Sequence, residues 1–407
     1  MQVSILSSIR LIFICLTLVP LTHHLSLAQS TTSSGSPNAT NQAKPAHTNT
    51  SPASTQHLAL LLPLSGKQQA AGIAIRDGFL SAALQKPPTK RGNIDIFDTN
   101  EIGVIDAYSH ALQNGATMVI GPLLKDDLQT LVTAGLPSTP TLALNNLTNT
   151  EPNNAVLFQF ALDPEEEARQ VAQRAIADHH LRAIVLTPKN EWGQRILRAF
   201  SNELTNLGGK IIDSRSIEPN TNDQVTVVKS LFSAHKQTTS READGNSVKN
   251  NTIIDNRDDF DFIFLAAQPP QAKQLYPAIR FVLSNVAIPI YATSDSFATN
   301  SKSTDLDGLR IPDMPWIINP NADDSMHAIQ LEQNWEPTLQ QRSRLYAFGI
   351  DAFKLCDWLI APSSQHTSMM MGATGLLSID LSGRIHRQLE WALISNGIPK
   401  PLTDIDR

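Results

Sequence analysis

Short, continuously apolar runs recur between residues 57 and 291 and alternate with segments whose apolar residues recur at helical spacing. Alternating strands and helices are typical of parallel sheets with right-handed crossovers, and strands that are apolar throughout lie between two covering layers. The pattern therefore predicts an α/β protein. The predicted strands are Leu58–Leu62, Ile94–Phe97, Met118–Ile120, Thr141–Leu144, Ala183–Leu186, Phe262–Ala266 and Ile288–Tyr291.

Two of the predicted helices carry clear end signals. Asp163 is a typical N-cap residue, Pro164 suits the first helical position, and three glutamates follow near the positive end of the helix dipole. A second helix carries apolar residues from Ile196 to Leu207 at helical spacing and is stopped by a Gly-Gly pair. Both helices are expected to cover a sheet.

Three stretches of the chain do not fit the α/β pattern. Residues 1–28 hold one charge, Arg10, then an apolar run and small residues before Gln29, which is the layout of a cleaved signal peptide. Residues 29–55 are rich in Ser, Thr, Asn, Ala and Pro, and we expect a disordered polar tether there. Residues 233–257 are also polar and are predicted to form a flexible insert.

Composition narrows the class of protein. The 407 residues, 41% of them hydrophobic, suffice for two or three domains with their own cores, and a net charge of −6 argues against nucleic-acid binding. Cys15 lacks the small residue that precedes a lipidated cysteine, so we expect no lipid anchor. No apolar run reaches the roughly 18–20 residues that span a bilayer, so we also expect no membrane span after signal cleavage. Cys356 then remains alone, within an apolar set at helical spacing, and is predicted to be a buried, inert thiol.

Motifs for catalysis are weak throughout. Ser65-Gly66-Lys67 lacks the first glycine and the final Ser or Thr of a phosphate loop, and Asp178-His179-His180 ends a helix without a partner motif for a metal. Asp258, Asp259 and Asp261 precede a predicted strand and are expected to be solvated or capping. The sequence therefore predicts no catalytic residue, no metal and no cofactor.

Loops at the carboxyl ends of the predicted strands are the candidate ligand site, because open α/β sheets bind ligands there. The candidates are Ser65, Gly66, Gly121, Pro122, Asn145 and Asn146. An equally good interpretation is that these Ser, Gly, Pro and Asn residues only form tight turns.

The same loops resemble those of type I periplasmic binding proteins and, more narrowly, the LppC/LpoA family of penicillin-binding-protein activators. The motifs that carry the resemblance run in order from residue 60 to residue 391. They are Leu60-Leu61-Leu62-Pro63-Leu64-Ser65-Gly66, Ala74-Ile75-Arg76-Asp77-Gly78-Phe79, Val119-Ile120-Gly121-Pro122-Leu123-Leu124-Lys125, Thr141-Leu142-Ala143-Leu144-Asn145, Trp192-Gly193-Gln194-Arg195, Asp259-Phe260-Asp261-Phe262-Ile263-Phe264-Leu265, Asp305-Leu306-Asp307-Gly308, Pro315-Trp316, Gly349-Ile350-Asp351-Ala352, Gly372-Ala373-Thr374-Gly375-Leu376-Leu377 and Gly383-Arg384-Ile385-His386-Arg387 before Trp391.

The resemblance implies two Rossmann-like lobes with parallel sheets around a cleft. We expect lobe 1 to comprise residues 57–161 and 293–371, and lobe 2 residues 162–292 and 372–400. It further implies a periplasmic, non-enzymatic regulator of peptidoglycan synthesis that binds a class A penicillin-binding protein and stimulates its transpeptidase. The helical-repeat domain and lipobox of the family have no counterpart in the sequence, so outer-membrane association is expected only with a different start or anchor.

A periplasmic solute-binding protein for an amino acid or small peptide is the alternative. Leu123, Leu124 and Leu142 near the candidate loops disfavour it, because an apolar surface cannot pair the charges of a zwitterion. For a protein partner, Trp192, Arg195 and Trp316 are the predicted interface residues, since exposed aromatics and arginines dominate interface energies. Burial of both tryptophans is the competing expectation.

Overall fold

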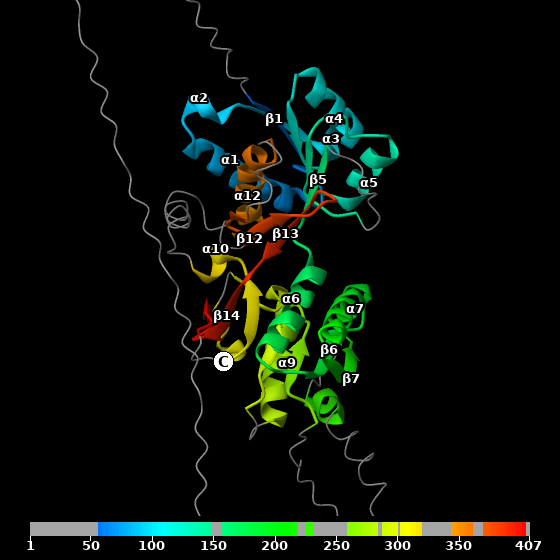
Figure 1. Cartoon of the computed structure of the whole chain (residues 1–407), viewed down its shortest axis with the longest axis vertical. Helices are drawn as coiled ribbons and strands as arrows, with labels where there is room; N and C mark the ends of the chain where they lie inside the picture. The colour runs from blue at the N-terminus through cyan, green and yellow to red at the C-terminus, as the bar shows by residue number, and fades with distance from the viewer. Residues whose placement is uncertain are drawn as a thin grey trace, which may run out of the picture. The chain divides into compact units, whose positions relative to one another are not determined.

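The computed structural model describes residues 56–147, 156–218, 225–231, 259–283, 287–299, 302–319, 343–360 and 369–403. Two sheets organise this part of the chain (Figure 1). The predicted signal peptide, the predicted tether and the predicted insert all lie outside the described residues. Among the described helices, none combines the length and the apolar character that a bilayer crossing demands.

The first sheet has eight strands in the order β11-β12-β13-β5-β4-β3-β1-β2. Strands β1 to β5 and β13 are parallel, while β12 is antiparallel to both β11 and β13. The strands are β1 (His57–Leu62), β2 (Asn93–Asp98), β3 (Met118–Ile120), β4 (Thr141–Ala143), β5 (Leu157–Phe160), β11 (Met370–Met371), β12 (Leu376–Ile379) and β13 (Arg384–Gln388).

The second sheet has seven strands in the order β15-β14-β10-β9-β8-β6-β7. Strands β6 to β10 are parallel, and β14 and β15 extend the sheet antiparallel at one edge. The strands are β6 (Arg182–Pro188), β7 (Lys210–Ile217), β8 (Phe262–Leu265), β9 (Ile290–Ala292), β10 (Arg310–Asp313), β14 (Glu390–Ser395) and β15 (Ile398–Pro401).

Helices cover both faces of each sheet. In the first lobe they are α1 (Gln69–Gln85), α2 (Pro88–Arg91), α3 (Thr99–Ile102), α4 (Val104–Gln113), α5 (Lys125–Thr133) and α12 (Ser343–Ile360). In the second lobe they are α6 (Pro164–Ala177), α7 (Glu191–Asn206), α9 (Pro269–Val282), α10 (Pro315–Ile318) and the short 3-10 turns η1 (Ser294–Ser296) and η2 (Thr304–Leu306). Figure 1 shows α1 beside α12 and α6 beside α7, pairs that are in extensive contact.

Apolar cores lie on both sides of each sheet, which explains the continuously apolar strands. Under α1 and α12, Phe160 stacks on Phe348 with ring centroids 4.5 Å apart. Under α6 and α7, Phe200 stacks on Phe264 at 4.3 Å. The seven strands predicted from the sequence are all present, as are the Asp163 cap, whose side chain accepts from the Glu165 N–H at 3.0 Å, and the helix that ends before Gly208.

Two glycines let α1 and α12 pack closely. A Cβ added to Gly78 would lie 2.0 Å from the Tyr346 carbonyl oxygen, and one added to Gly349 would lie 2.1 Å from that of Ile75. A real Cβ atom cannot sit at such distances, so each helix requires glycine where it meets the other's backbone. Both glycines belong to motifs that the sequence analysis singled out.

The strands near the C-terminus do not divide between the lobes as predicted. Strand β10, expected in lobe 1, pairs with β9 in the second sheet, whereas β12 and β13, expected in lobe 2, belong to the first sheet. The chain changes sheet at the single buried residue Leu389, between β13 and β14. Because two short strands of similar pattern flank that residue, no turn or linker signal marks the crossing.

Candidate functional site

Ser65 and Gly66 form the turn between β1 and α1. The Asp98 carboxylate at the end of β2 accepts from the Leu64 N–H at 2.9 Å, and the Asn100 side chain donates to the Ser65 carbonyl at 2.5 Å. Burial raises the pKa of Asp98, but hydrogen bonds from Ser65, Leu64 and Asn100 outweigh it and lower the pKa overall. Gly66 is exposed with φ +68°. The polar groups of this turn are therefore largely occupied by one another.

Gly121, Pro122, Asn145 and Asn146 lie together after β3 and β4. The Gly121 N–H donates to Leu142 at 2.8 Å, and the Pro122 carbonyl accepts from Leu144 at 3.0 Å. The Asn145 side chain donates to the Leu123 carbonyl at 2.8 Å and accepts from the Asn146 N–H at 2.9 Å. This supports the turn-forming interpretation, and a role in ligand binding stays a prediction.

Trp192 and Arg195 lie on the first turns of α7, and Trp316 lies on α10. Trp192 is half-buried against the core under α6 and α7, whereas Arg195 is exposed and pairs with Glu165 at the start of α6. Trp316 is also half-buried, with its ring 5.8 Å from that of Tyr346. The structure does not bring Trp192 and Trp316 into one surface cluster, and only Arg195 presents most of its side chain to solvent.

A buried ionic cluster that no sequence pattern predicts joins the two lobes. Arg344 on α12 pairs with Asp313 at the end of β10 through Nε–Oδ1 (2.9 Å) and Nη2–Oδ2 (2.5 Å). The same guanidinium donates to the Ser294 carbonyl at 3.0 Å. Burial alone would lower the pKa of Arg344, but Asp313 raises it overall, so the guanidinium keeps its charge. Arg344 and Asp313 are 31 positions apart on different elements, and no motif in the sequence connects them.

Glu167 completes this cluster from the first turn of α6. Its Oε2 accepts from the N–H and the hydroxyl of Ser294 at 3.0 and 2.8 Å, and its Oε1 lies 3.8 Å from Arg387 Nη2. Burial and the nearby charge of Asp295 raise the pKa of Glu167 to about 7. A carboxyl group with a shifted pKa can mark an active site. Here the Glu167 carboxylate instead contacts Ser294 and Arg387, and these contacts hold parts of the fold together.

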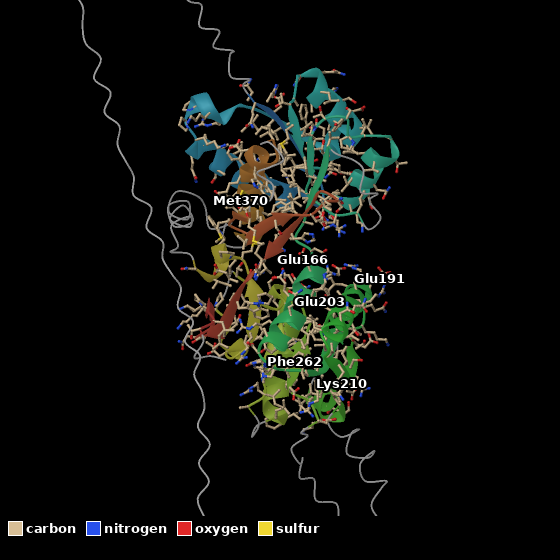
Figure 2. The ribbon with its side chains drawn as sticks, in the orientation of Figure 1. Glu166, Glu191, Glu203, Lys210, Phe262 and Met370 are labelled. Carbon is tan, nitrogen blue, oxygen red and sulfur yellow. The ribbon has the colours of Figure 1, made fainter. Side chains whose placement is uncertain are left out.

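A groove of about 770 Å³ lies between α6 and the strands β12 to β14. Glu166, on the first turn of α6, points to this region just below β13 (Figure 2). Its carboxylate accepts from His386 Nδ1 at 2.9 Å, while His386 Nε2 lies 2.9 Å from Asp380. Pairing with Glu166 is the main cause that raises the pKa of His386 to about 9. No local sequence pattern predicts this groove, because it joins residues more than 200 positions apart.

Other candidate groups have structural roles. Asp178 caps α6, His180 lies 3.1 Å from the Tyr291 hydroxyl, and Asp261 accepts from the Leu181 and Arg182 N–H groups at 2.9 Å. Cys356 is buried, and burial raises its pKa, as predicted for an inert thiol. Within the described residues, no group of three or more His, Cys, Asp or Glu side chains is placed to hold a metal ion.

Two α/β lobes linked by several chain crossings define the class of type I periplasmic-binding-protein-like domains. The LppC putative lipoprotein family matches residues 46–397, and the chain belongs to that family. It is 30% identical to the penicillin-binding protein activator LpoA of Photobacterium profundum, over 85% of this chain and 57% of that protein. The chain thus spans little more than half the length of this curated relative.

Solved structures agree with the fold. The C-domain of Haemophilus influenzae LpoA, described as a regulator of PBP1A, matches with a TM-score of 0.65 and 24% identity over 86% of this chain and all of that domain. A putative branched-chain amino acid ABC transporter protein of Chromobacterium violaceum matches with a TM-score of 0.63 and 24% identity, over 83% of this chain and 99% of that one. At this identity, both matches speak to the fold alone.

Proposed function

We propose that this chain is an envelope protein that binds a class A penicillin-binding protein and stimulates its transpeptidase, without catalysing a reaction itself. The observation that carries the proposal is the match of residues 46–397 to a family whose curated relatives are named penicillin-binding protein activators. We place the protein in the periplasm, because that is the compartment in which it would meet the synthase domain.

The geometry of the first-lobe loops favours this function over solute binding. A receptor for an amino acid needs free donors for a carboxylate and free acceptors for an ammonium group, because an unpaired buried charge is costly. Here the Asn145 side chain bonds to Leu123 and Asn146, and the Asp98 carboxylate accepts from the N–H groups of Leu64 and Asn100. Leu142, which the sequence placed near the ligand loops, is instead fully buried in the core, so it forms no part of a surface that a solute would contact.

Residues at the N-terminal ends of α6 and α7 are the proposed contact surface. Glu166 and Glu191 mark these two ends in Figure 2, and the ion pair between Arg195 and Glu165 links them. Arginine is enriched among residues that dominate interface energies. Trp192 would support this surface from below, since it packs on the core, and Trp316 is a less favoured candidate for the same reason.

The direct test is binding of the full chain to a purified class A penicillin-binding protein, measured by biolayer interferometry. We expect saturable binding that Arg195→Ala weakens and that Arg198→Ala, a matched exposed arginine on the same helix, leaves unchanged. Equal binding by the two variants would move the interface elsewhere. Absence of binding, together with a clear thermal shift by a free amino acid, would favour the solute receptor, because ligand at 100 times its Kd adds about 2.7 kcal/mol.

A further inference from the structure

The chain passes between the lobes after β5, after β10 and after β13, and each passage brings a charged side chain to the same place. Glu167 follows the first passage, on the first turn of α6. Asp313 and Arg344 lie on either side of the second, at the end of β10 and the start of α12, and Arg387 precedes the third in β13. Ser294 connects them, because it donates to Glu167 through its N–H and hydroxyl and accepts from Arg344 through its carbonyl. The lobes are therefore joined through charged groups.

Acids outnumber bases in this cluster, which we call the joint. If every carboxyl in the joint were ionised, one negative charge would have no partner. A buried group in that position takes up a proton instead, because an unpaired charge away from water is costly. Among the described residues, the acids of the joint are Glu167, Asp313 and Asp295 of η1, and its bases are Arg344 and Arg387.

Glu167 has the surroundings that suit the proton. Asp313 is paired at two points with a guanidinium, whereas Glu167 Oε2 accepts only from the neutral Ser294 and its Oε1 lies 3.8 Å from Arg387. Burial and the charge of Asp295 raise the pKa of Glu167 to about 7, from an ordinary value of 4.5. Asp295 is only half-buried, so water can reach it more easily than Glu167.

The other acids at the start of α6 are engaged outside the joint. Asp163 caps the helix, Glu165 pairs with Arg195 of α7, and Glu166 pairs with His386 of β13. The pair of Glu166 with His386 also links α6 to the first sheet. Because this pairing is the main cause that raises the pKa of His386 to about 9, His386 loses its proton only towards alkaline pH. Its titration must therefore be separated from that of Glu167 in any experiment.

We propose that protonation of Glu167 sets how tightly the two lobes are joined. With the proton in place, the charges of the joint balance and the three passages pack together. Loss of the proton leaves a net negative charge in the joint, which favours a looser arrangement that admits water. Because the pKa of this acid is raised in the packed form, packing is most favoured below about pH 4.5. That advantage falls as the pH rises to about 7 and is absent above it.

The test is hydrogen–deuterium exchange of the full chain at pH 6 and pH 8, read by mass spectrometry on peptides that contain Ser294 and Leu389. The N–H groups of these residues donate to Glu167 and to Gln170. After correction for the intrinsic pH dependence of amide exchange, the opening constant of the unmodified chain should rise about tenfold more than that of Glu167→Gln. The comparison isolates Glu167, because His386 titrates equally in both chains.

Glu167→Gln should also be better protected than the unmodified chain at pH 8. Glutamine keeps an acceptor oxygen for Ser294 and, like the protonated acid, carries no charge. A gain of protection is not a result that loss of folding can produce.

Glu191→Gln is the matched control, since Glu191 is an exposed glutamate on the first turn of α7. Its opening constant should rise with pH as in the unmodified chain. An equal rise in Glu167→Gln and in the unmodified chain, or weaker protection of Glu167→Gln at pH 8, would overturn the proposal. A rise that Glu167→Gln retains and Asp295→Asn abolishes would place the proton on Asp295 and overturn the assignment to Glu167. These outcomes do not depend on whether the chain binds a synthase.

Discussion

Arg344 of α12 forms a two-point ion pair with Asp313 of β10, and the Asp313 side chain is only 1% exposed. Arg344 belongs to the helix that covers the first sheet, and Asp313 to a strand of the second sheet. The pair therefore fastens one lobe to the other inside the protein. Its planar, two-point geometry is the strongest form of a charged hydrogen bond in proteins.

Replacing Arg344 should destabilise the fold strongly. In Arg344→Ala, Asp313 loses its partner and remains buried, which typically costs about 3–5 kcal/mol. Urea unfolding measures this loss, and Arg198→Ala should stay within about 0.5 kcal/mol of the unmodified chain. A loss below about 1 kcal/mol in Arg344→Ala would show that the pair does not hold the lobes.

Asp351 should be sensitive to loss of its charge alone. Its carboxylate accepts from the Ala373 N–H at 2.7 Å and from the N–H and hydroxyl of Thr374 at 2.7 and 2.6 Å. In Asp351→Asn the side-chain NH₂ group would face one of these N–H or O–H donors, which then has no acceptor. We therefore expect the free energy of unfolding in urea to fall by about 1–3 kcal/mol. Asp357→Asn, an exposed position on the same helix, should cost less than about 1 kcal/mol. Equal costs would mean that the turn after β11 does not need the carboxylate.

His386 should make stability depend on pH in the alkaline range. Its pKa is raised to about 9 in the folded protein, from an ordinary value of about 6.5. Its contribution is therefore complete below about pH 6.5 and is lost as the pH rises through about 9. Urea midpoints of the unmodified chain and His386→Gln, measured from pH 6 to 10, should converge as the pH rises. A constant difference across this range would contradict the pairing with Glu166 and Asp380.

Cys356 should resist thiol reagents until the protein unfolds. The side chain is 1% exposed, and burial raises its pKa, so little reactive thiolate is present at neutral pH. Labelling with 5,5′-dithiobis(2-nitrobenzoic acid), located by peptide mapping, should leave Cys356 unmodified in buffer and modify it in urea. Rapid labelling in buffer would show that α12 opens readily.

Much of the fold could be predicted from local pattern. Strands such as β1 and β8 are apolar throughout because each lies between two helical layers, and Asp163 with Pro164 marks the start of α6. Strands β5, β7 and β10 to β15 were not predicted. In β7 and β12 to β15 several side chains are exposed or half-buried and give no continuous apolar run.

The site could be predicted only in part. The turns at Ser65 and Asn145 were located because Gly, Pro and Asn mark turns locally. The ion pair of Arg344 with Asp313, and that of His386 with Glu166, join residues on different elements. No spacing rule connects such positions, so a single sequence carries no signal for them.

Activation of the synthase is measured directly by the rate of peptide cross-linking by a purified class A penicillin-binding protein, with and without the full chain. We expect a rate that rises with added protein and saturates at the concentration where binding saturates, while Arg195→Ala requires more protein for the same effect. An unchanged rate under conditions where the two proteins are shown to bind would contradict the proposed activation.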